Sequence, residues 1–327
     1  MPSEFDLIRQ HFTRATSHTD LGVGDDGALL RVAPGMQLVV STDMLVSGTH
    51  FLPEADPADI GWKTAAVNIS DMAAMTAQPR WITLALAMPA ADVDWVARFA
   101  EGFAACCAAF GVDWIGGDTT RGPLNLCATV FGEVPAGQAV LRGGGSAGDD
   151  IWISGWPGLA ALGLQTLLGQ RELPGEAREQ CLAALHRPQP RVALGLALRG
   201  VATAMLDVSD GLLGDLQHIL ERSACGAQLD EAALPLASVL AACGDAQVAR
   251  EALLRGGDDY ELLFCAPAAQ RAYLQGLGEK LALPLSRIGS LVEGEGIVMF
   301  GRDGSRESLA GKAYDHFGKP GEESAGH

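Results

Sequence analysis

The feature that most constrains the fold is a glycine-rich stretch at residues 135–150, PAGQAVLRGGGSAGDD, which separates two runs of alternating strand-like and helix-like segments. It shows little helix or strand periodicity, and this pattern predicts a domain boundary. The chain has 327 residues, more than one typical domain of about 100 to 200 residues requires. We therefore expect an N-terminal domain at 1–136, a glycine-rich junction at 137–149, a C-terminal α/β domain at 150–317 and a flexible tail at 318–327.

Hydrophobic periodicity predicts the elements of each half. In the first half we expect helices near 5–12, 57–77 and 92–110, and strands near 28–32, 37–42, 81–88, 112–115 and 124–134. In the second half we expect helices near 158–168, 176–185 and 190–202, with another after Gly211. The strands expected there lie near 151–154, 204–208, 260–266, 287–292 and 296–300.

The charge balance excludes several classes of protein. The chain has 23 Lys and Arg against 40 Asp and Glu, a net charge of −17, whereas a binder of nucleic-acid phosphates needs clustered cations. We expect no nucleic-acid partner, and a phosphate ligand would need divalent cations between it and these carboxylates. No stretch approaches the roughly 18 apolar residues of a membrane span, so we expect a cytoplasmic protein without a membrane partner.

Cysteine and glycine patterns exclude three further kinds of site. The seven cysteines include no CxxC pair, which argues against a disulfide framework and a thiolate zinc site. The string G-x-G-x-x-G occurs at 22–27 and 143–148, but neither copy has a strand before it and a helix after it, as a dinucleotide site requires. The phosphate-binding string G-x-x-x-x-G-K-[ST] is absent from the sequence.

Short acidic motifs with apolar neighbours occur in both halves. Their aspartates are Asp25 and Asp26 in GVGDDGALL, Asp43 in STDMLV, Asp71 in AVNISDMAAM, Asp118 in IGGDTTRG, Asp207 and Asp210 in LDVSDGLLGD, and Asp258 and Asp259 in GGDDYELLF. A carboxylate that points into an apolar environment requires a partner. Because few basic residues lie nearby, metal ions are the candidate partners, and carboxylates with the Ser41 and Thr42 hydroxyls favour Mg²⁺ over zinc or copper.

Each motif taken singly also fits a purely structural role. Asp118 fits a turn after two glycines, and Asp210 fits a helix cap before Gly211. His50 fits a loop histidine bonded to the backbone, and Tyr314 fits a residue that pins the end of the chain to the core. The repetition of six acidic motifs of similar construction favours the metal-binding hypothesis.

Seven strings resemble, in order and approximate spacing, the thiamine-monophosphate kinase family. They are GVGDDGALL, STDMLVSGTHF, AVNISDMAAM, GGDTTRGP, DVSDGLLGDLQHI, GGDDYELLF and YDHF, which together extend over nearly the whole chain. The family belongs to a superfamily that includes aminoimidazole-ribonucleotide synthetase, selenophosphate synthetase and a hydrogenase-maturation protein. The resemblance implies ATP-dependent phosphorylation of thiamine monophosphate to thiamine diphosphate, with Mg²⁺ as cofactor.

The resemblance also implies roles for particular residues. Magnesium ligands would be Asp26, Ser41, Thr42, Asp43, Asp71, Asp118 and Asp207, with Asp210 holding a further ion. The ATP site would include the Gly117-Asp118 turn, Arg142 and Ser209, and the thiamine moiety would face His50, Asp258 and Tyr314. This sequence has Asp258 where related proteins often have glutamate, which shortens the reach of that side chain by one methylene.

The implied fold is a two-domain, synthetase-like α/β (α+β) chain. Its N-terminal domains would pair in a homodimer to form a β-barrel, with active-site clefts between the domains. An acceptor phosphate with a second pKa near 6 is already an anionic nucleophile at neutral pH, so no catalytic general base is expected. Magnesium held by Asp43, Asp71 and Asp118 would support direct in-line transfer without a phosphoenzyme.

Two alternatives stay open. One is another ATP-dependent enzyme of the superfamily, of which the purine-synthesis branch is the hardest to exclude. The selenophosphate and hydrogenase branches would require a reactive N-terminal or a C-terminal cysteine, whereas the first cysteine here is Cys106 and the chain ends in Gly326-His327. The other is a non-catalytic protein that binds divalent metal, which the absence of the EF-hand spacing disfavours.

Overall fold

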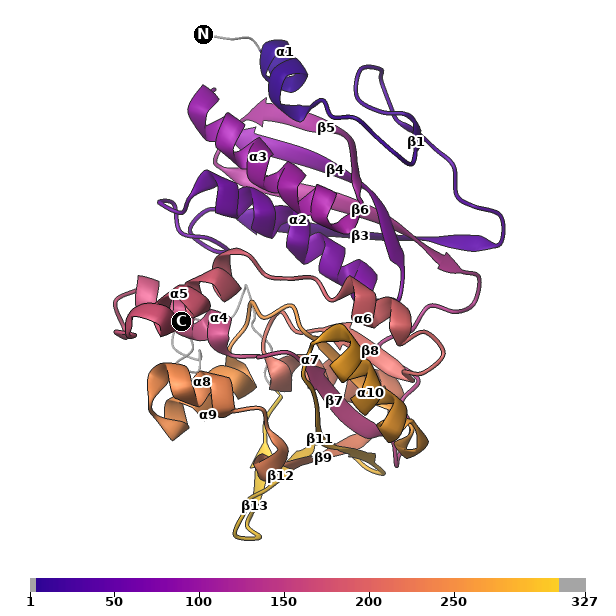
Figure 1. Cartoon of the computed structure of the whole chain (residues 1–327), viewed down its shortest axis with the longest axis vertical. Helices are drawn as coiled ribbons and strands as arrows, with labels where there is room; N and C mark the ends of the chain where they lie inside the picture. The colour runs from indigo at the N-terminus through magenta and orange to yellow at the C-terminus, as the bar shows by residue number, and fades with distance from the viewer. Residues whose placement is uncertain (1–3, 312–327) are drawn as a thin grey trace. The chain divides into compact units, whose positions relative to one another are not determined.

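The computed structural model describes residues 4–311, which divide after Ala139 into two compact units (Figure 1). Tyr314 and the expected tail at 318–327 lie outside the described residues. Each unit contains helices and one large sheet, as the alternating pattern of the sequence predicts.

The first unit is built on a four-stranded sheet with the order β3-β6-β4-β5. The strands are β3 (Met36–Val46), β4 (Gln78–Met88), β5 (Asp113–Arg121) and β6 (Asn125–Pro135). The helices are α1 (Glu4–Leu7), a π-helical segment (Ile8–Phe12), α2 (Pro57–Ala74) and α3 (Val93–Phe110). A small separate hairpin joins β1 (Thr19–Leu21) to β2 (Leu29–Leu30).

Helices α2 and α3 cover one face of this sheet (Figure 1). Helix α2 begins where the Asp56 carboxylate accepts a hydrogen bond from the amide of Ala58, with Pro57 at the first helical position. The two helices pack backbone to backbone, because a Cβ atom at Gly61 would lie 2.1 Å from the carbonyl oxygen of Phe99. This close contact fixes α2 against α3, and α2 carries Asp71, one of the predicted site residues.

The helices of the first unit leave the opposite face of its sheet uncovered. Alternate residues of β3 lie on that face, where the exposed fractions are 43% for Leu38, 52% for Val40 and 52% for Met44. One chain thus supplies an open four-stranded sheet, and its described residues form no closed barrel. The predicted dimeric β-barrel needs a second copy and stays a prediction.

The second unit contains a seven-stranded, mostly antiparallel sheet with the order β13-β12-β9-β11-β7-β10-β8. The strands are β7 (Asp150–Ser154), β8 (Ala204–Asp207), β9 (Gly226–Asp230), β10 (Leu262–Ala266), β11 (Leu285–Val292), β12 (Ile297–Phe300) and β13 (Arg306–Leu309). The helices are α4 (Leu159–Leu167), α5 (Gly175–His186), α6 (Val192–Ala197), α7 (Leu212–Ser223), α8 (Ala237–Cys243), α9 (Ala246–Arg255) and α10 (Arg271–Leu281).

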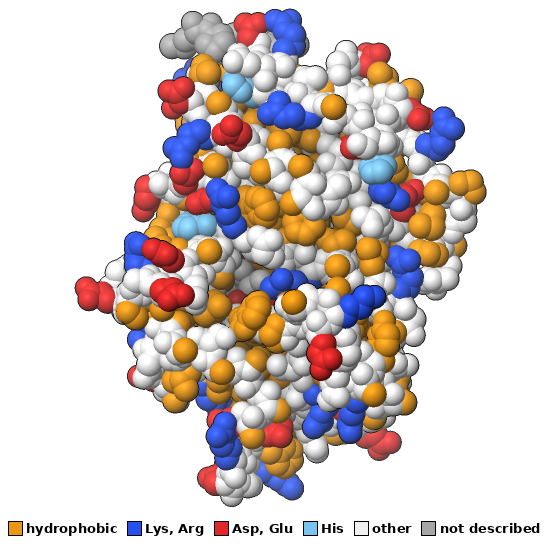
Figure 2. Space-filling model, viewed as in Figure 1, with side chains coloured by type: hydrophobic (Ala, Val, Ile, Leu, Met, Phe, Trp, Pro, Cys, Tyr) orange, Lys and Arg blue, Asp and Glu red, His pale blue; other side chains and the backbone are white. Residues whose placement is uncertain are grey.

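Two apolar clusters form the core of this unit. In one, leucines and Ile219 of α7 pack with strand residues such as Ile151 and Leu263. The other joins helices α4, α5, α8 and α9 through residues such as Leu162 and Val239. Figure 2 shows acidic and basic side chains interspersed over the face in view. No helix within residues 4–311 is both long and apolar enough to cross a membrane.

Candidate functional site

Strand β3 and helix α2 bring two predicted magnesium ligands into direct contact. The Ser41 hydroxyl donates a 2.6 Å hydrogen bond to Oδ2 of Asp71. The amide of Asp43, two residues further along β3, donates to Oδ1 of Asn68 at 3.1 Å. Residues 41 and 43 of a strand point to the same face, and here that face meets α2. The structure thus brings Ser41 and Asp43 next to the helix that carries Asp71, and their role as magnesium ligands stays a prediction.

The Thr42 side chain lies on the other face of the sheet. Its hydroxyl is within 2.9 Å of the Thr129 hydroxyl, and Thr42 is exposed with its neighbours Val40 and Met44. Successive residues of a strand alternate between faces, so the Thr42 hydroxyl cannot join Ser41 and Asp43 without leaving the strand conformation.

His50 lies in the turn that follows β3. Its Nδ1 accepts a hydrogen bond from the amide of Val46 at 3.0 Å, so the neutral ring carries its proton on Nε2. The carbonyl of His50 accepts a 3.3 Å hydrogen bond from Nζ of Lys63, a buried lysine on α2. Helix α2 thus holds both β3 and the His50 turn.

Asp118 is separated from this group within one chain. The sequence favoured a turn at Gly117-Asp118, but both residues lie inside β5, because β5 stays paired with β4 as far as Arg121. Strands β3 and β5 form opposite edges of the sheet, and three strand spacings of ~4.8 Å place them about 14 Å apart. Asp43 and Asp118 of one chain therefore do not meet.

Asp26 lies in the exposed connection between β1 and β2. Its amide donates to the Asp25 carboxylate at 3.0 Å. The base of this hairpin is held by the buried carboxylate of Asp113, which accepts hydrogen bonds from the amides of Ser17 and His18. Gly22–Gly27 thus forms a hairpin connection followed by β2 and not by a helix, which confirms that this copy of G-x-G-x-x-G is no dinucleotide fingerprint.

In the second unit, Asp207, Ser209 and Asp210 follow one another around the end of β8. The amides of Ser209 and Asp210 each donate a 3.0 Å hydrogen bond to Oδ2 of Asp215, on the first turn of α7. Burial raises the pKa of Asp215 to about 8, and the charges of Asp210 and Asp207 contribute to the rise. Asp210 does not cap α7 as its position allowed, since Gly211 occupies the cap position.

The backbone at Asp258 also contacts the loop that follows β8. Its amide donates to the carbonyl of Ser209 at 2.9 Å, and the amide of Tyr260 donates to the carbonyl of Val208 at 2.8 Å. The Tyr260 hydroxyl lies 3.2 Å from Oδ1 of Asp258. The structure thus brings together the predicted positions Ser209, Asp210 and Asp258.

Arg142 is exposed at the start of the second unit. It follows Leu141, whose carbonyl accepts a 2.9 Å hydrogen bond from the amide of Met205 on β8. The second copy of G-x-G-x-x-G follows directly and leads into β7, so it too lacks the helix that a dinucleotide site requires.

Within the described residues, no group of three or more His, Cys, Asp and Glu side chains is arranged to hold a metal ion. The predicted ligands occur instead as smaller groups, Ser41 with Asp71 in the first unit and Asp207 with Asp210 in the second. These donors fit Mg²⁺ in type, because all are oxygen atoms of carboxylates or hydroxyls. Burial is the largest cause of the raised pKa of Asp215, and the charges of Asp210 and Asp207 add to it; a bound divalent cation would offset those two charges.

Sequence reasoning missed three residues that support these groups. Asn68 and Lys63 lie on α2 and bond the backbone at Asp43 and His50, and Asp215 bonds the loop at Ser209 and Asp210. A signal existed in each case, because each is a polar residue among apolar neighbours in a predicted helix. The sequence does not show that such a side chain reaches a backbone amide or carbonyl of another segment.

Two family models match the chain. "AIR synthase related protein, N-terminal domain" matches residues 24–134, and "AIR synthase related protein, C-terminal domain" matches residues 146–302. The thiamine-monophosphate kinase of Salmonella typhimurium (strain LT2) is 42% identical over 324 residues, 97% of this chain and 99% of the relative. That of Escherichia coli (strain K12) is 41% identical over 321 residues, with coverage of 97% and 99%.

Solved structures agree with these matches and confirm the two-domain, synthetase-related α/β fold. The thiamine-monophosphate kinase of Stenotrophomonas maltophilia K279a has 48% identity and a TM-score of 0.80, covering 88% of this chain and 92% of that one. A structure described as "AaThiL complexed with AMPPCP and TMP" has 29% identity and a TM-score of 0.75, covering 90% and 92%. The hydrogenase maturation protein HypE, with 20% identity and a TM-score of 0.77, shares the fold. Identity above 40% over nearly the full length settles the relationship, and the chain belongs to the thiamine-monophosphate kinase family, a family of kinase enzymes.

Proposed function

We propose that this enzyme transfers the γ-phosphoryl group of ATP to thiamine monophosphate and so forms thiamine diphosphate. The observation that carries the proposal is identity above 40% with two curated thiamine-monophosphate kinases over 97% of the chain. The relative described as "AaThiL complexed with AMPPCP and TMP" supports ATP as the co-substrate. The site residues on which the proposal depends lie in both units.

Mg²⁺ is the proposed cofactor. When bound, it would neutralise the phosphate oxygens and align the acceptor for in-line transfer. In the first unit, Asp43 and Asp71 would hold magnesium with Ser41, and Asp26 would join from the β1–β2 connection. In the second unit, Asp207 would be a ligand and Asp210 would hold a further ion. Thr42 faces away from this group, so any contribution from it would come from its main chain.

The remaining predicted residues would bind the two substrates. Arg142, Ser209 and Gly117 would contact the nucleotide, while His50 and Asp258 would face the thiamine moiety, with Tyr314 assigned to the same moiety from sequence alone. The Nε2–H of His50 is a hydrogen-bond donor fixed by the bond at Nδ1. No residue is assigned as a general base, because the acceptor phosphate is already anionic near neutral pH. Direct transfer without a phosphoenzyme follows from this assignment.

A homodimer would explain where Asp118 acts. Asp43 and Asp118 lie on opposite edges of one sheet, and the uncovered face of that sheet is apolar. If two such sheets close into an eight-stranded barrel by a two-fold axis along the barrel, β5 of each copy meets β3 of the other. Asp118 of the partner would then join the Asp43–Asp71 group, which no single chain completes.

A coupled assay of ADP release tests the activity. ADP formed with thiamine monophosphate and Mg²⁺, and not without the acceptor, is the expected result. ADP formed with formylglycinamidine ribonucleotide as acceptor would support the purine-synthesis branch instead. No ADP with either acceptor would leave only the metal-binding hypothesis.

A further inference from the structure

The segment that presents Asp258 has an unusual backbone. Asp258 and Tyr260 are not glycines, yet their φ angles are 66° and 51°, in the left-handed region. This conformation costs free energy for a residue with a Cβ atom and persists only where the surroundings hold it. Such strain commonly occurs at functional sites, so the contacts that hold this turn bear on the position of Asp258.

One set of contacts lies between the turn and the loop that follows β8. A Cβ atom at Gly257 would lie 2.5 Å from the carbonyl oxygen of Ser209, so only glycine permits this approach. The amides of Asp258 and Tyr260 donate to the carbonyls of Ser209 and Val208. The turn and the loop thus form one unit of backbone hydrogen bonds.

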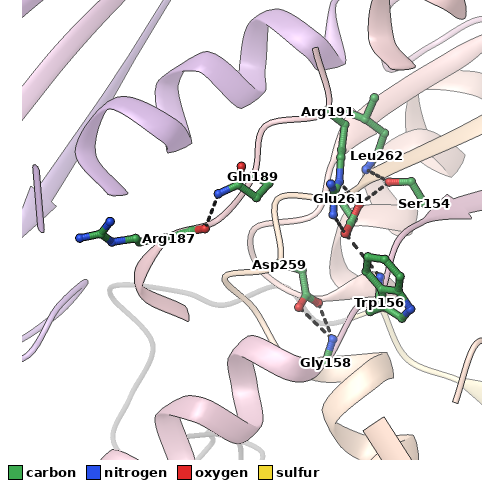
Figure 3. A network of polar contacts seen from close by, with 9 residues as sticks. All are labelled: Ser154, Trp156, Gly158, Arg187, Gln189, Arg191, Asp259, Glu261 and Leu262. Carbon is green, nitrogen blue, oxygen red and sulfur yellow. Dashed lines mark hydrogen bonds and ion pairs between the residues drawn. The ribbon is translucent and has the colours of Figure 1, made fainter. Parts of the chain in front are cut away.

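The other set of contacts anchors the end of the turn through Glu261, which is 4% exposed. Figure 3 shows the Arg191 guanidinium on its carboxylate, where Nε lies 2.7 Å from Oε2 and Nη2 contacts Oε1. The Ser154 hydroxyl donates to Oε2 at 2.5 Å and accepts from the amide of Leu262. Arg191 directly precedes α6, and its side chain is 20% exposed.

The ion pair between Arg191 and Glu261 lies in a segment rich in carboxyl groups. Asp258, Asp259 and Glu261 place three carboxyl groups within four residues. The Asp259 carboxylate accepts hydrogen bonds from the amide of Gly158, at the start of α4 (Figure 3). Removal of Arg191 would leave the buried Glu261 without its cation, and a buried charge without a partner is strongly unfavourable. The turn would then relax toward solvent.

We propose that Arg191 is a positioning residue that, through Glu261, holds the Asp258–Tyr260 turn against the Ser209 loop and thereby sets the place of Asp258. The inference rests on the proposed function, which assigns Asp258 to the thiamine moiety. It adds a partly buried residue, at the N-terminal end of α6, that none of the acidic motifs includes.

Steady-state kinetics test the consequence for the substrate. Arg191→Gln keeps a polar side chain without the charge, and we expect KM for thiamine monophosphate to rise about tenfold while KM for ATP changes less than about twofold. Arg191→Lys restores the charge without the bidentate geometry and should recover part of the loss. An unchanged KM for thiamine monophosphate in both variants would overturn the proposal.

Hydrogen exchange tests whether Arg191 holds the Asp258–Tyr260 turn, and it requires no measurement of enzyme activity. In Arg191→Gln the amides of Asp258 and Tyr260 should exchange at least about tenfold faster, while those of residues 263–266 in β10 keep their protection. Equal acceleration throughout β10 would show general destabilisation and overturn the proposal. If the wild type forms no ADP with thiamine monophosphate, the proposed function fails, yet the exchange experiment still tests Arg191.

Arg271 provides a matched control. It makes a bidentate ion pair with Asp150, which is 1% exposed, at the end of β7 opposite Ser154. Arg271→Gln should lower the thermal midpoint, with KM for thiamine monophosphate and exchange at Asp258 unchanged. If Arg191→Gln does not fold, Arg191→Lys and Glu261→Gln can be compared with Arg271→Gln in the same two measurements. Equal kinetic effects of the Arg191 and Arg271 substitutions would contradict a positioning role.

Discussion

The amide nitrogen of Asp43 donates a 3.1 Å hydrogen bond to Oδ1 of Asn68, across the boundary between an edge strand and a helix. Asn68 is fully buried and uses its Nδ2 to donate to the carbonyl of Thr64 at 2.9 Å. Both ends of the side chain are therefore committed, one to its own helix and one to β3. The position of Asp43 relative to Asp71 thus depends on a residue that is not among the predicted magnesium ligands.

Asn68→Ala should raise the Mg²⁺ concentration needed for half-maximal activity, because Asp43 loses its anchor to α2. We expect a stability loss of about 1 to 3 kcal/mol, since buried polar groups lose their partner. Thr64→Val is the control. It removes a buried hydroxyl that donates to the carbonyl of Ile60 one turn earlier, and it should cost about 1 kcal/mol with an unchanged Mg²⁺ requirement. Equal Mg²⁺ requirements in the two variants would refute a role for Asn68 in placing Asp43.

Asp71→Asn should reduce kcat by about two orders of magnitude or more at saturating Mg²⁺, because it removes a charged ligand while an amide oxygen can still accept from Ser41. Ser41→Ala removes only a neutral donor and should have a smaller effect. Circular dichroism and the thermal midpoint establish that both variants are folded. Near-normal turnover of Asp71→Asn would remove this residue from the metal site.

The sequence predicted the elements that carry the acidic motifs, because strands such as β3 and β4 and helices such as α2 and α3 have clear periodicity and caps. It missed β1, β9, β13, α8, α9 and α10. Polar residues obscure the pattern in α9 and α10, and the other four elements are too short to show a clear period. It also ended the strand at Ile115, while β5 continues to Arg121. Two glycines and Asp118 favour a turn locally, but pairing with the long strand β4 overrides this preference.

The candidate site was predictable in its residue types and less so in its geometry. The strings AVNISD and STDM indicated that Asp71 and Asp43 matter, and the contact between β3 and α2 agrees with this. The alternation of faces that sends the Thr42 side chain away from that of Asp43 follows from the two-residue period of a strand. The separation of Asp43 from Asp118 depends on the strand order β3-β6-β4-β5, which is a long-range property that no local pattern encodes.

Met44→Glu should weaken or abolish the proposed homodimer, because it places a charge on the exposed apolar face of β3. Sedimentation or light scattering at several protein concentrations measures the change. Asp303→Lys alters charge at an exposed turn of the second unit and should leave the association state unchanged. A Met44→Glu protein with the mass of the wild type at every concentration would exclude this face as the interface.

Mixing two inactive variants tests whether Asp118 acts on the partner. Asp43→Ala and Asp118→Ala should each be inactive alone. After exchange of chains at equal amounts, half of the dimers are mixed, and each mixed dimer has one intact site if Asp118 acts across the interface. Activity should then recover to about one quarter of the wild-type value. Without cross-subunit action, every site carries a lesion and the mixture stays inactive.

The pH dependence of stability should report the carboxyl of Asp259, a partly buried residue. Burial raises the pKa of Asp259 well above its usual value of 3.8, with the charges of Glu261 and Asp258 adding to the rise. Above pH 3.8 the unfolded chain releases this proton while the folded protein retains it, so the contribution of Asp259 to stability falls as pH rises, until the pH passes the pKa of the folded state.

Asp259→Asn keeps an acceptor for the amide of Gly158 and removes the titration. The unfolding free energy of the variant minus that of the wild type should therefore rise with pH, by at most about 1.4 kcal/mol per unit. Urea unfolding at pH 5, 6, 7 and 8 measures this difference. For Asp303→Asn we expect no such rise, because the Ser305 hydroxyl and amide lower the pKa of Asp303. If the difference in unfolding free energy between Asp259→Asn and the wild type does not change with pH, the Asp259 carboxyl is ionised in the folded protein.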